Sequence, residues 1–485
     1  MKTLPSSVIF IGAGPSALFA ARRLKQLAKE QGKEIKCILV ERELEVGGKC
    51  RTFSDPDHHE LKTEWGAGAV AANYGVVIDA LKEHGIAFEN MLPIETQTIE
   101  LRQKYDKLTI SEKMMFIKKL VEEITVFNSD YDVYKNAKQN KMELPEELSK
   151  PFEKYAALKK MEHLPLFLKP LVPGFGYGSL SHCPTYSILE YLGKMTIPEI
   201  LIAENILKQP GLLAIHGGFQ LLMAKIAAGF DVRLGAQITQ IERALDKVTV
   251  HYLQDGVEHS ETAEVLVLAT SPKNWPSLNL KLTDTEKKCV NQLEYYRYPV
   301  AVYRIKGLPP KQYYFPKALE ESGFGHLALI TSRDNRKEPE EGRLCTIYIN
   351  LPSNNNNYVI DHELIQHELK SIGGVTGSVL VKDKVWEDYM STLPWEVRLE
   401  LDKEQQDSNT LYLGSYALGG FEDVVCVANK ATDTINEFFS PNMSYEENGK
   451  LENIKRAWYF FSDPVYAPIS SFDKHPDPTN RCMLF

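Results

Sequence analysis

The sequence predicts an α/β fold, and three observations support this prediction. Near the N-terminus an apolar run, Val8–Ile11, leads into the glycine turn Gly12-Ala13-Gly14-Pro15-Ser16-Ala17, and a helical pattern follows. A second apolar run, Cys37–Val40, ends in the acidic residue Glu41. Short apolar segments of the same kind return in the middle of the chain and near its end. Strand, glycine turn, helix and acid-terminated strand together form the βαβ unit that binds dinucleotides in Rossmann-type folds.

Each part of this unit has a physical role. Gly12 permits the tight turn out of the strand, and Gly14 lets a pyrophosphate approach the backbone. The helix that starts near Pro15 and Ser16 presents N–H groups and the positive end of its dipole to the phosphates. Glu41 is placed to accept hydrogen bonds from a ribose 2′-OH. A chance glycine turn, the alternative, does not account for the strands, helix and acid together.

Length and composition limit the remaining possibilities. A chain of 485 residues exceeds what one hydrophobic core usually serves, so two domains are expected. The net charge of −9, without a basic block, argues against a nucleic-acid partner. Seven cysteines without regular spacing argue against a disulfide framework, and no cluster has zinc spacing, so we expect no metal. Without a signal peptide or an apolar stretch of membrane length, a cytoplasmic location is expected.

The α/β pattern is interrupted twice. From about residue 109 to residue 209 the pattern is mostly helical, and residues 298–305 and 344–351 show β alternation. The sequence therefore predicts a nucleotide-binding domain that is discontinuous in sequence, with an inserted mixed α+β substrate domain. We expect residues 1–100, 210–275 and 400–440 to form the nucleotide-binding domain, residues 101–209 and 276–399 the substrate domain, and residues 441–485 a C-terminal extension.

This organisation resembles the FAD-dependent amine-oxidase-like superfamily. The most distinctive match is the element E-x(5)-G-G-[RK], here Glu41 followed by Gly47-Gly48-Lys49. The family more often has Arg after the two glycines, so this cationic contact differs in detail. The segment Gly66-Ala67-Gly68-Ala69 is similar to the glycine turn that lies along the flavin ring in the family.

The resemblance continues in the later segments. The strand around Ile238 is similar to the one whose backbone holds the adenine. The segment from Gly414 to Val424 occupies the place of the last FAD motif, where Gly414-Ser415 departs from the Gly-Asp of the strict family form. The version with Phe421 is more similar to a side branch that includes polyenoic fatty acid isomerases. Because no cysteine precedes the last helix in this motif, non-covalent FAD is implied.

Carried over residue by residue, the resemblance implies a set of FAD-binding residues. They are Gly12, Gly14, Pro15, Ser16, Glu41, Arg42, Gly47, Gly48, Lys49, Gly66, Ala67, Gly68, Ala69, Ile238, Gly414, Phe421 and Val424.

The resemblance leaves three functions open. The first is an FAD-dependent oxidoreductase that passes a hydride from a small organic substrate, apolar or polar, to flavin. The second is a redox-neutral double-bond isomerase acting on a fatty acid, and the third is a flavin-fold scaffold without turnover. As catalytic candidates, Tyr177 and Tyr416 fall in segments expected to border the flavin, although either could be an ordinary packed tyrosine.

The chain ends in Cys482-Met483-Leu484-Phe485, a C-a-a-X prenylation pattern whose last residue suits geranylgeranyl. The alternative is coincidence, since the motif has meaning only in a prenylating host. With little basic charge upstream, a prenyl group on Cys482 would give weak membrane association. The expected partner is otherwise a small-molecule substrate, and the oligomeric state is left open.

Overall fold

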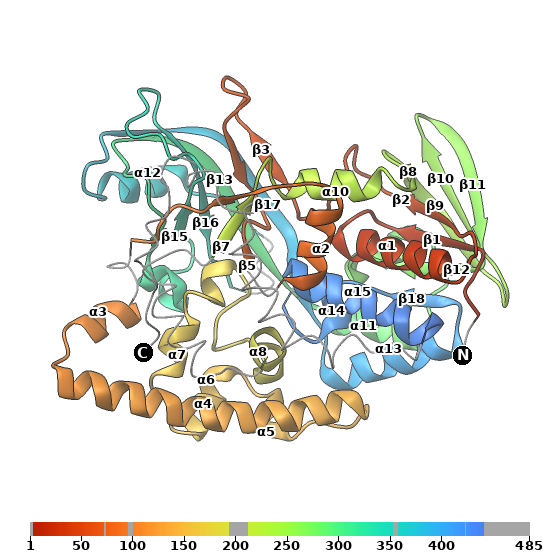
Figure 1. Cartoon of the computed structure of the whole chain (residues 1–485), viewed down its shortest axis with the longest axis horizontal. Coiled ribbons are helices and arrows are strands. Elements are labelled where there is room, and N and C mark those ends of the chain that lie inside the picture. Colours follow the sequence, from red (N-terminus) through yellow and green to blue (C-terminus); the bar gives the residue numbers. More distant parts are fainter. Residues whose placement is uncertain are drawn as a thin grey trace, which may run out of the picture.

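A five-stranded parallel sheet forms the centre of the nucleotide-binding half. The structure is a computed structural model, and it describes residues 3–71, 74–95, 100–193, 212–352, 357–421 and 423–440. In sheet order the strands are β18 (Thr410–Tyr412), β12 (Val265–Leu268), β1 (Ser7–Ile11), β2 (Lys36–Val40) and β8 (Asp231–Arg233). Every pairing in this sheet is parallel, so segments far apart in sequence lie side by side (Figure 1). The predicted α/β class and discontinuous Rossmann-type domain are confirmed.

Alternate residues of β1 face two different layers. Val8 and Phe10 pack in the core shared with the helices, whereas Ile9 and Ile11 pack toward a small antiparallel sheet. That sheet consists of β9 (Gln237–Arg243), β10 (Val248–Gln254) and β11 (Val257–Ala263). The parallel sheet is therefore buried on both faces, which explains why its strands are almost continuously apolar.

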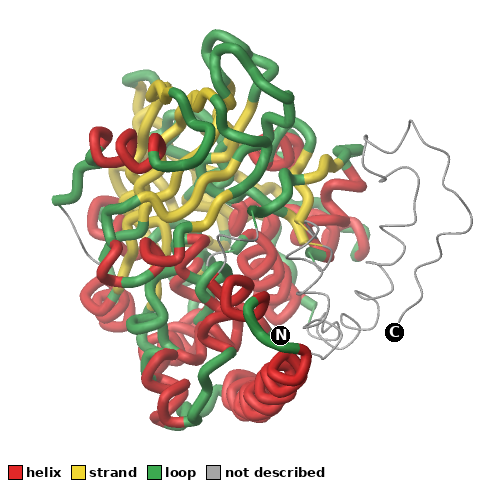
Figure 2. The backbone as a smooth tube through the Cα atoms, turned by 90° about the vertical axis from the view of Figure 1, so that its left-hand side faces the viewer, coloured by secondary structure: helices red, strands yellow, loops and turns green. Residues whose placement is uncertain are grey.

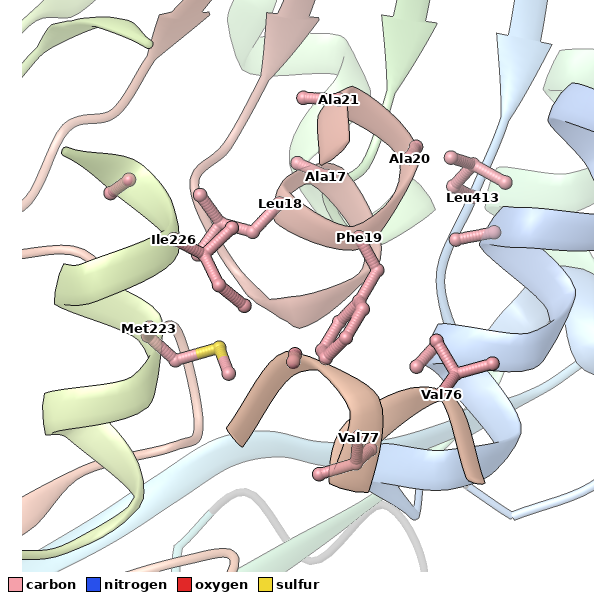
Figure 3. Close-up of a cluster of buried hydrophobic side chains, with 14 of the residues drawn as sticks. Ala17, Leu18, Phe19, Ala20, Ala21, Val76, Val77, Met223, Ile226 and Leu413 are labelled. Atoms are coloured by element: carbon pink, nitrogen blue, oxygen red, sulfur yellow. The ribbon is translucent and has the colours of Figure 1, made fainter. Parts of the chain in front are cut away.

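The first helix, α1 (Pro15–Glu30), is enclosed by three others. Figure 3 shows Phe19 of α1 directed toward Val76 of α2 (Gly75–Glu83), with Met223 of α10 (Phe219–Ala227) on the other side. The helix α15 (Val424–Phe439) packs along α1 as well. This packing fixes the N-terminus of α1 at the sheet edge where β1 ends.

The second half is built on a five-stranded antiparallel sheet. Its strands, in sheet order, are β14 (Tyr313–Tyr314), β15 (Leu327–Thr331), β16 (Arg343–Ile349), β13 (Glu294–Lys306) and β17 (Gly377–Thr392). β13 and β16 lie where β alternation is predicted, but all seven residues of β16 are buried. In β16 the alternation therefore does not separate buried from exposed side chains, because both faces of this sheet are covered.

Helices of the insert cover one end of this sheet. The longest is α4 (Ile110–Gln139), which begins with a capping box formed by Thr109 and Glu112. It runs along the lower edge of the molecule in Figure 1 and is seen nearly end-on in Figure 2. Together with the antiparallel sheet, these helices confirm a mixed α+β insert.

The remaining elements are short. The other helices are α3 (Glu100–Asp106), α5 (Glu146–Ser149), α6 (Phe152–Leu158), α7 (Leu164–Leu168), α8 (Thr185–Leu192), α11 (Asp284–Gln292), α12 (His362–Lys370), α13 (Trp395–Asp407) and α14 (Ser415–Leu418), with 3₁₀ turns η2 (Pro173–Phe175), η3 (Pro272–Leu278), η4 (Pro316–Leu319) and η5 (Glu321–Gly323). The other strands are β3 (Thr52–Ser54), β4 (Lys62–Glu64), β5 (Val70–Ala71), β6 (Phe88–Asn90) and β7 (Leu212–Ile215).

Membrane spans, metal sites and disulfides can be assessed only in the described residues. Within them, no helix is long and apolar enough to cross a membrane, and no group of three or more His, Cys, Asp and Glu side chains is arranged to hold a metal. Their six cysteines are free thiols. The predicted C-terminal extension and Cys482 lie outside the described residues.

Candidate functional site

A cleft of about 470 Å³ opens at the carboxyl ends of the parallel strands. Its lining includes Ile11 at the end of β1, Gly12 after β1, Glu41 after β2, Ala269 after β12 and Gly414 after β18. In open α/β sheets ligands bind at this edge, where the strand order reverses. The fold thus brings the N-terminal unit and the last predicted motif together around one cavity.

Two glycine turns approach each other at the floor of the cleft. Gly12 has a φ of +101°, and a Cβ on it would lie 3.3 Å from the carbonyl oxygen of Ala269. Gly48 has a φ of +53°, and its Cβ would lie 3.1 Å from the Cα of Gly14. Side chains at these positions would fill the space beside the N-terminus of α1. The predicted E-x(5)-G-G-[RK] element and the first glycine turn therefore shape one cradle.

Pro15, Ser16 and Lys49 also line the cleft, whereas Gly47 supports it from behind. The amide of Gly47 donates to the carbonyl oxygen of Ala13 at 2.9 Å. This hydrogen bond holds the second glycine turn against the first.

The carboxylate of Glu41 is anchored by the backbone. Its Oε2 accepts from the amide of Ala13 at 2.8 Å, and its Oε1 accepts from the amide of Glu43 at 3.0 Å. The side chain is buried and lines the cleft. Since each carboxylate oxygen can accept more than one hydrogen bond, Glu41 retains acceptor capacity for a ribose hydroxyl.

A polar group in the cleft has no partner within the described chain. The hydroxyl of Ser271, just after β12, is buried and makes no hydrogen bond with any described residue. Buried polar groups are rarely left unpaired, so this hydroxyl indicates a ligand contact. With the glycine cradle and Glu41, the residues present fit a dinucleotide that carries a pyrophosphate and ribose hydroxyls.

The cleft is rimmed by charges of both signs. The cations are Arg42, Lys49, Arg51 and Lys384, and the acids are Glu41, Glu43, Glu387 and Asp388. Desolvation lowers the pKa of Lys384, and the nearby Arg51 and Arg42 lower it further. Its ammonium lies 3.8 Å from the centre of the Trp386 ring.

The turn at Gly66-Ala67-Gly68-Ala69 separates this cleft from a second cavity. A Cβ on Gly66 would lie only 2.1 Å from the carbonyl oxygen of Lys49, which lines the first cleft. Gly66, Gly68 and Ala69 line the second cavity. The turn therefore packs on the wall of the first cleft and lines the second cavity.

The second cavity, here called the tyrosine pocket, encloses about 50 Å³. Its aromatic walls are Tyr298, Tyr314, Tyr348 and Tyr389. The rings of Tyr298 and Tyr348 stack with centroids 5.3 Å apart, and those of Tyr298 and Tyr389 lie 4.6 Å apart. Burial raises the pKa of Tyr298, Tyr314 and Tyr348 far above neutrality, so their hydroxyls remain protonated.

A buried ion pair lies in the wall of the tyrosine pocket. Oε1 of Glu64 accepts from Nη1 of Arg333 at 2.9 Å and from the amide of Phe219 at 3.2 Å. Burial raises the pKa of Glu64 to about 7, although Arg333 acts to lower it. The pair joins β4 to the segment that follows β15, and Arg333 also donates to the carbonyl oxygen of Ile215 at 2.7 Å.

The last predicted motif contributes to the cleft through its first residues. Gly414, with a φ of +140°, and the following Ser415 and Tyr416 line the cavity. The Tyr416 hydroxyl donates to the carbonyl oxygen of Leu268 at 2.7 Å, which anchors it to β12. Tyr416 is thus at the site with its hydroxyl occupied by the backbone. Ile238, predicted on the adenine side, lines the same cleft.

Besides Gly47 and Ala67, which line neither cavity, three predicted residues lie away from both. Phe421 is fully buried and packs against Tyr177 in the core of the helical insert. Val424 is the first residue of α15 and packs in the core around α1. None of the three is among the described residues that line the cleft or the tyrosine pocket.

Sequence reasoning missed the contribution of β17. Lys384, Trp386 and Ser391 of this strand line the cleft, and the indole N–H of Trp386 donates to the carbonyl oxygen of Trp65 at 2.8 Å. The strand therefore holds the residue that precedes the Gly66 turn. No local motif marks these positions, because they reach the cleft only through the pairing of β17 with the distant strand β13.

Comparison with known proteins agrees with this arrangement. The family model of flavin-containing amine oxidoreductases matches residues 18–388. The structure of a fatty acid isomerase from P. acnes that produces CLA is similar with a TM-score of 0.69 and 20% identity, covering 90% of this chain and 100% of that one. Wild-type putrescine oxidase bound to putrescine gives a TM-score of 0.62 and 13% identity, covering 90% and 99%. At these identities the likeness concerns the fold.

A local sequence match was also found. Mitochondrial electron transfer flavoprotein-ubiquinone oxidoreductase of Mus musculus is 55% identical over 42 residues, 9% of this chain and 7% of the relative. The match thus spans only a small part of that relative's length. With a family model across most of the chain and a cleft that fits the dinucleotide, this protein belongs to the flavin-containing amine oxidoreductase family, whose cofactor is FAD.

Proposed function

We propose that this protein transfers a hydride from a small, largely apolar organic substrate held in the tyrosine pocket to FAD. The supporting observation is the position of that pocket: the Gly66–Ala69 turn that lines it packs on Lys49, which lines the cofactor cleft. FAD supplies the hydride-accepting chemistry when bound. The chain itself has to hold the substrate beside the turn and keep water out.

The tyrosines of the pocket suit an uncharged substrate. The Tyr348 hydroxyl donates to the carbonyl oxygen of Glu64 at 3.1 Å, and the Tyr298 hydroxyl donates to that of Gly174 at 3.4 Å. With these hydroxyls engaged by the backbone, the rings present mainly their apolar surfaces to the cavity. Nη1 of Arg333 lies 2.9 Å from Oε1 of Glu64, so the guanidinium is already paired at the pocket wall. An apolar substrate would therefore leave no polar group without a hydrogen-bond partner when it moves from water into the pocket.

A second candidate is a redox-neutral isomerase that moves a double bond in a fatty acid. The apolar walls of the tyrosine pocket favour this candidate, because they suit an acyl chain as well as another apolar substrate. The likeness to the P. acnes fatty acid isomerase is consistent with it. The two candidates differ in whether the flavin stays reduced after substrate has reacted.

Anaerobic mixing distinguishes these possibilities. The purified flavoprotein is mixed with amines, polyamines and polyunsaturated fatty acids while flavin absorbance is followed. Lasting bleaching, with hydrogen peroxide formed when O₂ is admitted, supports the oxidoreductase. A shifted double bond without net bleaching supports the isomerase. If neither occurs with any class while FAD remains bound, the non-catalytic scaffold is favoured and our proposal is wrong.

A variant that fills the pocket provides the structural control. Ile94 lines the tyrosine pocket and is partly buried, so Ile94→Trp should block substrate-driven bleaching while the FAD content is unchanged. Val257→Trp, at an exposed position on β11, is the matched control and should react as the wild type does. Equal activity of both variants would place the substrate elsewhere.

A further inference from the structure

Large apolar side chains are exposed at the start of α4. The side chains of Ile110, Met114 and Met115 are 81%, 69% and 60% exposed, although they lie within six residues of one another. Ile110 and Met114 are four residues apart and are therefore neighbours on the helix surface, and Met115 follows Met114 in the chain. Scattered exposed apolar residues need no explanation, but a contiguous group of this kind indicates an interaction surface.

The same segment is basic in an acidic protein. Residues 103–119 contain five lysines and two acidic residues, whereas the whole chain carries a net charge of −9. One of the acids, Glu112, is engaged by the capping box with Thr109. The lysines are Lys104, Lys107, Lys113, Lys118 and Lys119. Ile110, Met114 and Met115 together with these five lysines are called the α4 patch below.

We propose that the α4 patch binds the anionic surface of a lipid bilayer. Apolar side chains beside lysines form the combination by which interfacial helices enter the headgroup region, with the ammonium groups near lipid phosphates. Figures 1 and 2 show that this end of α4 lies at the periphery of the molecule, where a flat surface can reach it. Charge complementarity selects the occupant: the lysines of the α4 patch fit an anionic membrane surface.

Apolar side chains continue from the α4 patch toward the tyrosine pocket. Phe116, next to Met115, packs against the buried cluster that contains Tyr298 and Tyr314. Phe167 of α7 packs against the same cluster. Resting on the proposed function, this continuity gives an apolar substrate dissolved in lipid a route toward the pocket. Binding to the bilayer does not depend on that step.

A patch of this size gives weak, reversible binding by itself. Three apolar side chains and a few lysines correspond to one membrane signal, and stable anchoring generally takes two. The C-a-a-X motif at Cys482 would supply the second signal in a host that prenylates it. The two signals can be separated, because protein made in bacteria lacks the prenyl group.

Vesicle co-sedimentation tests the proposal. The full-length, FAD-loaded protein from a bacterial host is mixed with vesicles of phosphatidylcholine alone or with added phosphatidylserine. We expect binding that requires phosphatidylserine and weakens as salt is raised. Ile110→Ser/Met114→Ser/Met115→Ser and Lys118→Glu/Lys119→Glu should each lower the partition coefficient about tenfold or more. Cys482→Ser should bind as the wild type does.

Matched substitutions elsewhere control for general effects. Leu245→Ser and Val359→Ser remove apolar side chains that are 100% and 82% exposed, and Lys33→Glu reverses an exposed charge far from α4 in sequence. These variants should keep wild-type binding, and flavin absorbance and melting temperature check that every variant is folded. The proposal is overturned if the wild type ignores phosphatidylserine, or if patch and control variants bind alike.

The same protein variants also test the main alternative, which is a contact between two copies of this chain. If the wild type is a dimer by size-exclusion chromatography and the Ile110/Met114/Met115 variant is a monomer, the α4 patch is a contact between copies and the lipid proposal is wrong. Flavin reduction by substrate in detergent is measured in parallel. Vesicle binding without turnover would contradict the proposed function and leave the lipid surface standing, and turnover without vesicle binding would do the reverse.

Discussion

The ring of Tyr177 stacks on the ring of Phe421, with centroids 5.0 Å apart and planes only 9° apart. Tyr191 of α8 packs edge-on against both, at 5.4 Å and 5.3 Å. One partner comes from the helical insert and the other from the segment that joins α14 to α15. Through this contact, the last cofactor motif is fixed to the insert by aromatic packing.

We expect Phe421→Ala to destabilise the fold by about 3 kcal/mol or more, because it removes a fully buried ring and leaves a cavity between three segments. Tyr177→Phe keeps the stacked ring and should cost about 1 kcal/mol or less. Urea unfolding followed by fluorescence measures both. If Phe421→Ala is as stable as the wild type, the stacked pair does not join the two parts as described.

Gly48→Ala should abolish or strongly reduce FAD binding. The substitution puts a Cβ 3.1 Å from the Cα of Gly14, at a positive φ, in the floor of the cleft. Gly32→Ala is the matched control: its φ is +64°, but no atom lies within 4 Å of the added Cβ. Both variants carry backbone strain, and only Gly48→Ala narrows the cradle. Flavin absorbance per protein after purification shows the difference, and equal FAD content in the two would refute it.

Ser271→Ala should weaken FAD binding by about threefold to tenfold, the effect of losing one hydrogen bond to a ligand. The hydroxyl of Ser378 on β17 is also buried without a partner among the described residues, but it lies outside the cleft. Ser378→Ala should therefore leave the affinity unchanged. Titration of the apoprotein with FAD, followed by quenching of flavin fluorescence, gives both dissociation constants. A change at Ser378 equal to that at Ser271 would contradict the assignment.

Glu64 gives the stability of the protein a predictable dependence on pH. Its pKa is raised from 4.5 to about 7 in the fold, chiefly by burial, so the folded state binds a proton more tightly than the unfolded state. The associated stabilisation is complete below pH 4.5 and is lost as the pH rises through 7. Relative to Glu64→Gln, the wild type should lose up to about 3 kcal/mol over this interval.

Unfolding of both proteins in urea at several pH values measures this difference. The absolute cost of Glu64→Gln does not matter, because only the change in the difference with pH reports the titration of Glu64. Well above pH 7 the difference should become constant. A difference that grows in favour of the wild type as the pH rises would mean that Arg333 lowers the pKa of Glu64 by more than burial raises it.

The local part of the fold and site could be predicted from the sequence. β1, the glycine turn, α1 and β2 are set by contiguous residues, and Glu41 follows from their spacing. The glycines at positions 12, 14 and 48 could be identified because a close approach of backbone to ligand tolerates no other residue. These residues line the predicted cleft.

The rest of the site depends on contacts between distant segments. Trp386 reaches the cleft because β17 pairs with β13 along its length, and Arg333 meets Glu64 because a segment after β15 lies against β4. Neither contact has a local pattern. Phe421 shows the reverse case, since its motif position suggests the cofactor but its packing places it in the core of the insert.

The order of strands in the parallel sheet has a consequence for how the chain folds during synthesis. β1 lies between β2 and β12, and β18 completes the edge beyond β12. More than four hundred residues must therefore leave the ribosome before β18 can pair with β12. Until then one edge of the sheet and the apolar face awaiting α15 stay uncovered, which makes the nascent chain dependent on protection from aggregation. Capture of FAD, whose cleft needs the residues after β18, is then a late event that completes folding.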